Sequence, residues 1–171
     1  MTYQEEVIQR FLDSGIVFTE AELASIDFAD FSLNRLETEG LNLIIYENND
    51  RYCAKEMVLL PGQTCPEHRH PPRNKEAGKR ETFRCRKGKV YLYVEGEAVA
   101  AIQSKIPAGQ EAYYTVMHEV ELNPGEQYTI EPNIKHWFQA GNEGAIISEF
   151  SSPSDDASDI FTNPAIQRVT K

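Results

Sequence analysis

A series of short β-prone runs between Leu41 and Phe150 constrains the fold of this chain more than any other feature of its sequence. The runs read LNLIIYE, YCAKEMVLL, ETFRCRKG, KVYLYVEG, HEVELNPG, QYTIEP, KHWFQAG and AIISEF. Turn-forming proline, glycine and asparagine residues punctuate them, and no helical pattern lies between them. Many short strands at this spacing predict an antiparallel barrel or sandwich.

The first 40 residues predict two short helices instead. In TYQEEVIQRFLDSG the apolar residues Val7, Phe11 and Leu12 recur at helical spacing. A second helix is expected in TEAELASI, because glutamates in its first turn suit the positive end of the helix dipole. The length of 171 residues suits one domain. We expect residues 1–40 to form a helical extension, residues 41–150 the barrel, and the Ser-, Asp- and Pro-rich residues 151–171 a loop.

The composition of the chain excludes some classes of binding partner and indicates a cellular compartment. The chain has 17 Lys and Arg against 27 Asp and Glu, a formal charge of -10, so nucleic acid and membranes are not expected as partners. No apolar run approaches the roughly 20 residues needed to span a bilayer. The first residues lack a secretory signal, which predicts a cytoplasmic protein. The cysteines Cys53, Cys65 and Cys85 are odd in number and form no CxxC pattern, which favours free thiols in a reducing compartment.

A candidate metal site lies in the stretch PGQTCPEHRHPPRNKEAGKRETFRCRKG. His68 and His70 are two residues apart, so on a strand both imidazoles point to the same face. Glu81 opens the next β-like run, and His136 lies in EPNIKHWFQAG. Three imidazoles and one carboxylate can hold a divalent Mn, Fe, Co, Ni or Zn ion with positions left for substrate. Glu76 competes for the carboxylate position, but Glu81 is favoured because it begins a strand.

The spacing of these residues with neighbouring glycines resembles the cupin superfamily. A first cupin motif holds a glycine, the His-x-His pair, a glutamate and a closing glycine, and a second holds a glycine, a proline and the last histidine. The resemblance implies an all-β cupin-type antiparallel barrel, or jelly roll, with the short N-terminal helices added. Ten residues separate His70 from Glu81, more than cupins usually have, so a loop must bulge out there. The second motif also lacks a glycine between Pro132 and His136.

From Leu41 to its end the chain is similar to the cupin-type D-lyxose isomerases, in the strings PGQTCPEHRHPP, YTVMHEVELNPGEQYTIEPNIKHWFQAG and EFSSPSDD and in Lys55. These enzymes interconvert D-lyxose and D-xylulose, often also D-mannose and D-fructose, with a divalent metal that is usually manganese. The resemblance implies a homodimer, a monosaccharide substrate, and the metal ligands His68, His70, Glu81 and His136. It also implies that Lys55 and Glu149 handle protons and contact the substrate. Asp155 is expected to bind sugar hydroxyls, and the adjacent Asp156 competes for that role.

The residue types agree with this chemistry. Aldose–ketose isomerisation moves a proton between C1 and C2 through an enediol, which needs a base, an acid and a positive centre. Glu149 is the expected base, because an ionisable residue on the apolar face of a strand is costly unless it is paired or functional. Lys55 is expected to polarise or protonate the sugar oxygen. Phe138 shares strand parity with His136 and is expected to close the apolar side of the sugar. A metal-assisted hydride shift needs the same ligands and stays open.

Other functions remain to be weighed. A cupin dioxygenase also uses three histidines and one glutamate, but the polar set of Lys55, Glu149 and Asp155 argues against its apolar pocket. A non-catalytic sugar-binding cupin would bind without turnover. An epimerase or a phosphosugar isomerase is a third alternative, and a phosphate group would need a cluster of basic residues. The inserted loop contains such residues, which we expect to be solvated or to cap the site: Arg73, Lys75, Lys79 and Arg80. The preferred aldose, the metal, the oligomeric state and the pathway stay undecided by the sequence.

Overall fold

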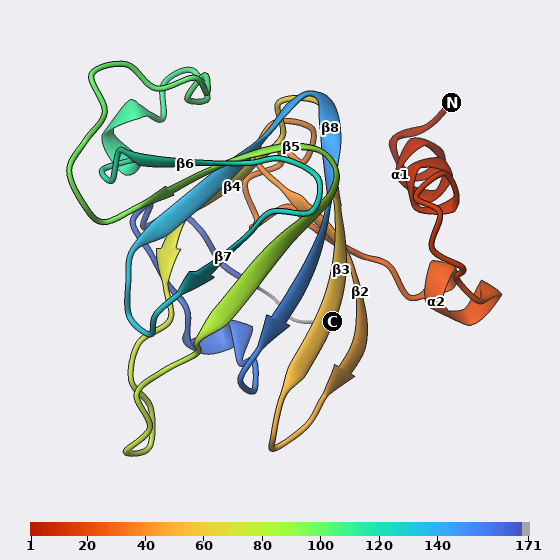
Figure 1. Cartoon of the computed structure of the whole chain (residues 1–171), viewed down its shortest axis with the longest axis horizontal. Coiled ribbons are helices and arrows are strands. Elements are labelled where there is room, and N and C mark those ends of the chain that lie inside the picture. Colours follow the sequence, from red (N-terminus) through yellow and green to blue (C-terminus); the bar gives the residue numbers. More distant parts are fainter. Residues whose placement is uncertain (169–171) are drawn as a thin grey trace.

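The β-prone runs form antiparallel strands that curl into a barrel (Figure 1). The computed structural model describes residues 1–168. The predicted all-β cupin-type barrel with short N-terminal helices is confirmed. The strands are β1 Asp27–Ala29, β2 Leu41–Asn48, β3 Cys53–Leu59, β4 Thr64–Arg69, β5 Glu81–Val94, β6 His118–Leu122, β7 Gln127–Ile130, β8 His136–Ser151 and β9 Ile160–Phe161.

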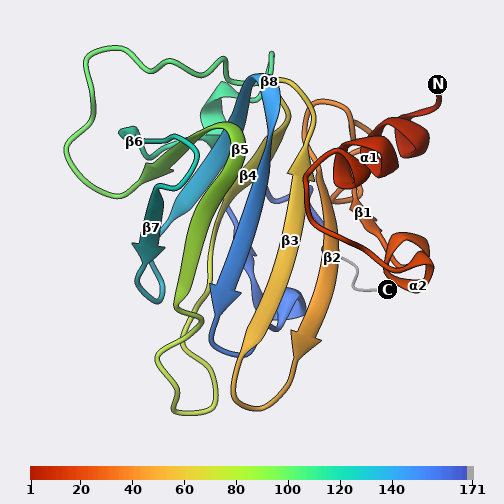
Figure 2. The ribbon, with the colours of Figure 1, turned by 45° about the vertical axis from the view of Figure 1, so that its right-hand side comes forward.

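Strand β8 pairs with three other strands and so links the parts of the sheet. The main path runs β1-β2-β3-β8-β4-β9, and β5 pairs with β6, β7 and β8 (Figure 2). Because β8 is 16 residues long, its first part lies beside β4 and its second part beside β3, while β5 follows both. One strand therefore connects the two sides of the barrel that carry the candidate site.

Two pairs of the expected runs are joined into single long strands. ETFRCRKG and KVYLYVEG form β5, and KHWFQAG and AIISEF form β8. The register of β5 against β8 shifts on either side of Gly88, so this glycine marks a bulge and not a turn between strands. Gly88 has a φ of 74°, and a Cβ there would collide with the carbonyl oxygen of Gly144. Only glycine meets both conditions without strain.

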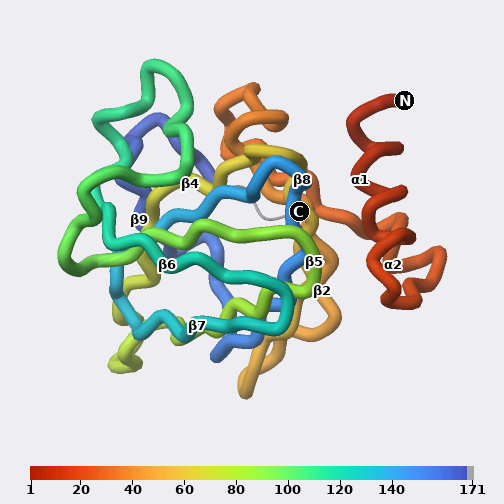
Figure 3. Tube along the Cα trace, turned by 45° about the horizontal axis from the view of Figure 1, so that its top comes forward, coloured from red at the N-terminus to blue at the C-terminus, as the bar shows by residue number. Residues whose placement is uncertain are grey.

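The two predicted helices lie outside the barrel against β2, β3 and β8 (Figure 3). They are α1 Tyr3–Leu12 and α2 Glu20–Ala24, and each begins with a capping box. Val7 and Phe11 of α1 pack on Ile44 and Val58 of the sheet. The expectation that Leu12 shares this face is wrong, because Leu12 is 51% exposed. Consecutive helical residues lie about 100° apart, so the neighbour of a buried Phe11 turns towards solvent.

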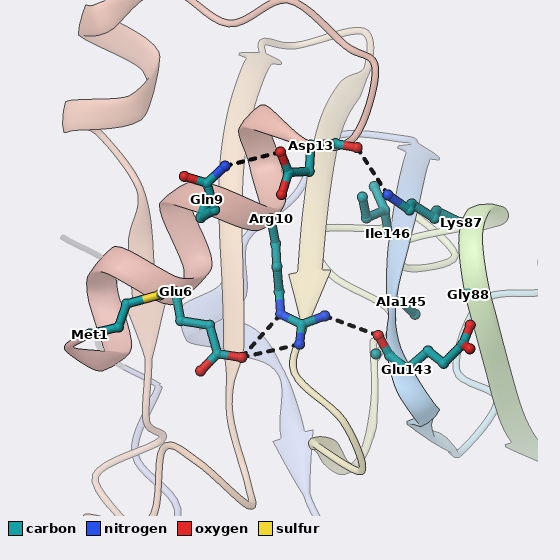
Figure 4. A pocket seen from close by; sticks show the side chains of 11 residues that line it. Met1, Glu6, Gln9, Arg10, Asp13, Lys87, Gly88, Glu143, Ala145 and Ile146 are labelled. Atoms are coloured by element: carbon teal, nitrogen blue, oxygen red, sulfur yellow. Dashed lines mark hydrogen bonds and ion pairs between the residues drawn. The ribbon is translucent and has the colours of Figure 1, made fainter.

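Polar contacts fix α1 to the bulged end of the barrel (Figure 4). Arg10 Nη1 donates to the carbonyl oxygen of Glu143 at 3.0 Å, and Lys87 Nζ donates to the carbonyl oxygen of Asp13 at 3.0 Å. A surface pocket of about 510 Å³ lies between these elements and contains none of the histidines. It therefore belongs to the docking of the helix and not to the candidate metal site.

Two short strands lie outside the expected 41–150 barrel. β1 extends the sheet beside β2, and β9 lies beside β4, where Phe161 is opposite His68. Two 3-10 turns also form, η1 Glu111–Tyr113 and η2 Asp156–Ser158. The composition of the polar tail predicts a loop, and the two residues of β9 are too few to show a strand period in the sequence. No helix among residues 1–168 is long and apolar enough to cross a membrane.

A buried glutamate on the outer face of β3 leads to a prediction about stability. Ser148 Oγ lies 2.9 Å from both carboxylate oxygens of Glu56, which is only 3% exposed. Burial raises the pKa of Glu56 above 4.5, against the opposing effects of Ser148 and Arg86. Because the pKa of Glu56 is higher in the folded protein than in the unfolded chain, the protonated side chain favours folding. This contribution to the free energy of unfolding is fully present below pH 4.5 and is lost as the pH rises through the pKa of the folded state.

We therefore expect Glu56→Gln to raise the melting temperature at about pH 7, and the gain to vanish near pH 4 and below. Thermal unfolding of both proteins across this range measures the effect. Glu47→Gln, at an exposed position of the neighbouring strand β2, is the control that should show no such trend. A rise in melting temperature at pH 4 that equals the rise at pH 7 would contradict a raised pKa of Glu56.

Candidate active site and metal centre

The four predicted metal ligands converge at one end of the barrel. His68 lies on β4, His70 follows its last residue, and Glu81 and His136 begin β5 and β8. The pairing of β4 with β8 sets His68 opposite His136. Asn133 N donates to the carbonyl oxygen of His70 at 3.0 Å, which ties the β7–β8 loop to the same place. One nitrogen or oxygen atom from each of the four ligands lies within 4.8 Å of the others, and all four residues are buried.

All three imidazoles are oriented in the same way. The Nδ1 atoms of His68 and His136 lie 2.8 and 2.9 Å from the carbonyl oxygens of Pro66 and Ile134, each two residues earlier in the chain. Nδ1 of His70 lies 2.5 Å from a carboxylate oxygen of Asp159. Since these oxygens only accept, each Nδ1 carries a proton and each neutral ring leaves Nε2 as the lone-pair atom.

The residues present fit a divalent transition metal. His136 Nε2 is buried and makes no hydrogen bond within residues 1–168, although Oε1 of Glu81 lies 2.9 Å away. The same Oε1 lies 3.1 Å from Nε2 of His70. A buried polar atom without a hydrogen bond is costly, and a metal ion satisfies such an atom directly. Three neutral nitrogens and a carboxylate oxygen are a donor set for Mn, Fe, Co, Ni or Zn.

The protonation of the histidines follows from their surroundings. Burial, together with His136 and His70, holds the pKa of His68 well below 6.5. Burial also acts to lower the pKa of His70, but Glu81 and Asp159 outweigh it and raise that pKa to about 9. His68 is thus a neutral ligand at neutral pH, and His70 exchanges a proton for a metal ion.

A line of alternating charges joins the cluster to the predicted base. Lys79 Nζ lies 2.6 Å from Oε2 of Glu81 and 2.5 Å from Oε1 of Glu149. Burial opposes the charged forms, but the two carboxylates raise the pKa of Lys79 well above 10.5. In the same way burial is outweighed by Lys79 and His70, which hold the pKa of Glu81 well below 4.5. Glu149 Oε1 also lies 3.9 Å from Nζ of Lys55.

Sequence reasoning missed Lys79. The basic residues of the 71–80 loop were expected to be solvated or capping, and for Lys79 this is wrong: its side chain is 5% exposed. The loop does bulge outward as expected, and Glu76 is exposed at its tip, so Glu81 is the carboxylate at the cluster. Lys79 is two residues from Glu81, and side chains two apart on an extended chain share a face. That spacing is the signal that could have identified it.

Of the two neighbouring aspartates, Asp156 and not Asp155 lines the cavity beside the cluster. Asp155 is half exposed and its Oδ2 lies 2.6 Å from Nη1 of Arg73. Asp156 lies 3.6 Å from Lys55 Nζ and 3.1 Å from Nη2 of Arg168. Lys55, Glu149 and Phe138 also line the cavity, as the sequence predicted. Sugar binding by Asp155 stays a prediction, and its position does not favour it.

Aromatic rings form the apolar wall of the cavity. Phe138 is buried, with its ring 4.9 Å from that of Phe83. The ring centre of Phe161 on β9 lies 5.3 Å from the ring centre of His68 and 5.5 Å from the ring centre of Phe31. A sugar offers hydroxyl edges and apolar C–H faces, so a cavity with one charged wall and one aromatic wall suits such a ligand.

Comparison with known proteins decides the family. The chain matches the D-lyxose isomerase family over residues 19–171. It is 64% identical over 166 residues to the D-lyxose/D-mannose isomerase of Thermosediminibacter oceani, which covers 97% of this chain and 92% of that protein. The chain belongs to the D-lyxose isomerase family. It is therefore a sugar isomerase.

Further relatives agree with this assignment. The isomerase is 58% identical over 166 residues to the D-lyxose ketol-isomerase of Cohnella laeviribosi, with 97% of this chain and 91% of that protein covered. Its structure is similar to that of the L-ribose isomerase of Acinetobacter sp. DL28, with a TM-score of 0.77 at 14% identity. The alignment covers 96% of this chain and 92% of the other. At this identity the likeness establishes the shared cupin-type fold.

The geometry predicts that Mn²⁺ stabilises the isomerase through the histidine cluster. A ligand at one hundred times its Kd adds about 2.7 kcal/mol to the free energy of unfolding, which a thermal melt readily detects. His68→Ala should lose this stabilisation, because it removes a ligand. His118→Ala is the matched control, since its Nδ1 lies 2.9 Å from the carbonyl oxygen of Glu97, away from the cluster. Metal stabilisation that survives His68→Ala would contradict the proposed ligand set.

Proposed function

We propose that the isomerase is a metal-dependent aldose–ketose isomerase that interconverts D-lyxose and D-xylulose, and also D-mannose and D-fructose. The observation that carries this proposal is the position of Glu149, a buried carboxylate that shares Lys79 with the ligand Glu81. The substrate choice is supported by the names of the relatives, which are D-lyxose/D-mannose isomerase and D-lyxose ketol-isomerase. We further propose His68, His70, Glu81 and His136 as the ligands of the metal.

Glu149 is the proposed base that moves the proton between C1 and C2. Its carboxylate oxygen Oε1 lies 2.5 Å from Lys79 Nζ and 3.9 Å from Lys55 Nζ, so two ammonium groups fix the position of this oxygen in the cavity. Glu149 takes the proton from one carbon and returns it to the other, which leaves an enediol between the two steps.

The lysines are proposed to manage the charge on the sugar oxygens. Lys55 Nζ donates to Ser154 Oγ at 3.1 Å and lies 3.6 Å from Asp156, so it is held at the cavity wall with a donor towards the substrate. Lys79 holds Glu149 and Glu81 at a fixed separation. The bound metal would supply Lewis-acid stabilisation of the negative charge that develops on the oxygens at C1 and C2.

Manganese is the proposed metal. The donor set combines imidazole nitrogens with a carboxylate and contains no sulfur, since Cys65 lies 4.0 Å from Nδ1 of His68 and not at its Nε2. Sites without thiolate ligands suit Mn²⁺ and leave coordination positions for sugar oxygens. We also propose a cytoplasmic homodimer. Three free buried cysteines support a reducing compartment, and the dimer rests on the family resemblance.

The cavity beside the cluster is small, about 40 Å³, which is close to the space of one water molecule. A monosaccharide therefore displaces side chains when it binds. Phe31, Phe161 and Arg168 line the cavity from the loop after β1 and from the C-terminal segment, and both segments are outside the long strands.

The first prediction of this proposal concerns turnover. Glu149→Gln should reduce ketose formation from free aldoses by about 10²–10⁴-fold with metal binding retained, because it removes only the base. Assays with a panel of aldoses, with added Mn²⁺ or with a chelator, measure this. Glu56→Gln is the matched control, as it neutralises a buried glutamate on the outer face of the neighbouring strand. An unchanged rate in Glu149→Gln would show that Glu149 is not the base.

The same assay separates the other functions. Oxygen consumption by the metal-loaded protein without ketose formation would indicate a dioxygenase. Binding of a pentose or hexose without turnover would indicate a sugar-binding module. Either result would overturn the proposed function.

The second prediction concerns phosphorylated sugars. The cations of the cavity are each paired with carboxylates: Lys79 with Glu81 and Glu149, Lys55 with Glu149 and Asp156, and Arg168 with Asp27 and Asp156. A phosphate would need to break such a pair and face the released carboxylate. We therefore expect kcat/KM for mannose 6-phosphate to be more than about tenfold below that for mannose. Equal values would support a phosphosugar isomerase.

A further inference from the structure

The ligand His70 depends on the far end of the chain for its orientation. His68 and His136 each place Nδ1 against the carbonyl oxygen of the residue two positions earlier in the chain, Pro66 and Ile134. His70 lies one residue beyond the end of β4, and its Nδ1 meets Oδ1 of Asp159, 89 residues later in the sequence, at 2.5 Å. Of the three Nδ1 atoms, only that of His70 meets a carboxylate; the other two meet carbonyl oxygens.

The fold holds Asp159 firmly in this position. Asp159 lies between turn η2 and strand β9, and its side chain is only 10% exposed. β9 pairs with β4, with Ile160 opposite Arg69. Just beyond, Thr162 N donates to the carbonyl oxygen of Glu67 at 3.0 Å, and Thr162 Oγ1 donates to Oε1 of Glu67 at 2.6 Å. The segment that carries Asp159 is therefore fastened to the strand that carries the histidine pair.

A carboxylate at Nδ1 does two things that a carbonyl oxygen does less well. It fixes the tautomer with the proton on Nδ1, so that the neutral ring turns Nε2 towards Glu81. Its negative charge also makes Nε2 a more basic donor, which strengthens its bond to a cation.

We infer that Asp159 is a positioning residue for the metal site, which acts through His70 and not by contact with metal or sugar. The inference rests on the ligand set of the proposed function. It assigns a role to the C-terminal Ser- and Asp-rich segment: residues 159–162 complete the metal centre. Loss of a carboxylate behind a ligating histidine typically costs about 10–100-fold in metal affinity.

The test is direct titration with Mn²⁺, in which the electron paramagnetic resonance signal of free aqueous Mn²⁺ reports the unbound ion. Asp159→Ala should raise the Kd for Mn²⁺ by about 10–100-fold. Asp159→Asn keeps an oxygen that can accept from Nδ1 but loses the charge, so its Kd should lie between that of Asp159→Ala and that of the natural protein. If Asp159→Ala fails to fold, the Asp159→Asn titration alone decides, because its side chain has the same shape.

Two controls separate a positioning role from a structural one. Thr162→Val removes the hydrogen bond to Glu67 without touching His70, and should lower the melting temperature of the metal-free protein while leaving the Kd unchanged. Glu131→Gln removes an exposed carboxylate paired with Arg80, and should leave the Kd unchanged as well. A Kd for Mn²⁺ that rises to the same extent in Thr162→Val as in Asp159→Asn would overturn the inference, as would Asp159 variants that bind like the natural protein.

The same titration distinguishes this inference from the proposed function. Normal Mn²⁺ binding that weakens in the Asp159 variants supports the inference even if no aldose is isomerised, in which case the proposed reaction alone fails. Normal binding in all variants, with turnover intact, removes only the role of Asp159. Absence of Mn²⁺ binding by the natural protein would overturn both the manganese site and the inference.

Discussion

The buried ion pairs around Lys79 are the interaction on which the rest of the site depends. Burying a charged group costs several kcal/mol unless a partner compensates it, and Lys79 compensates both Glu81 and Glu149. Removing one member of such a set typically costs about 3–5 kcal/mol, because the others are left buried and unpaired. The same lysine therefore allows the carboxylates of Glu81 and Glu149 to be buried side by side in a cavity that also has an aromatic wall.

The sheet supplies the distances that this arrangement requires. β8 carries His136 at its start and Glu149 near its end, while β5 follows it in the opposite direction with Glu81 beside Ser151. If β8 were straight, His136 and Glu149 would lie far apart, because a strand rises roughly 3.3 Å per residue. The bulges around Gly88 curl the sheet, so Glu81 reaches the histidines and still faces Glu149 through Lys79. A backbone irregularity in the middle of β5 thus helps to shape the candidate site at the start of the strand.

The parts of the site that the sequence predicted are those encoded by short-range spacing. The alternation of a strand places His68 and His70 on one face, and the start of a β-like run distinguishes Glu81 from Glu76. The fold class followed from turn-separated runs, although the joining of β5 and of β8 did not, because a glycine marks a turn and a bulge equally well in a sequence. The homology to a known family supplied the roles of the remaining residues.

What the sequence did not reveal depends on contacts between distant segments. The choice between Asp155 and Asp156 is set by turn η2, which directs one side chain to Arg73 and the next to Lys55, and no local pattern encodes that direction. The same holds for Asp159, because only the pairing of β9 with β4 brings its carboxylate to Nδ1 of His70. Two histidines are oriented by carbonyls that any sequence would provide. The orientation of the third therefore depends on a side chain 89 residues away, and a single substitution at Asp159 removes it.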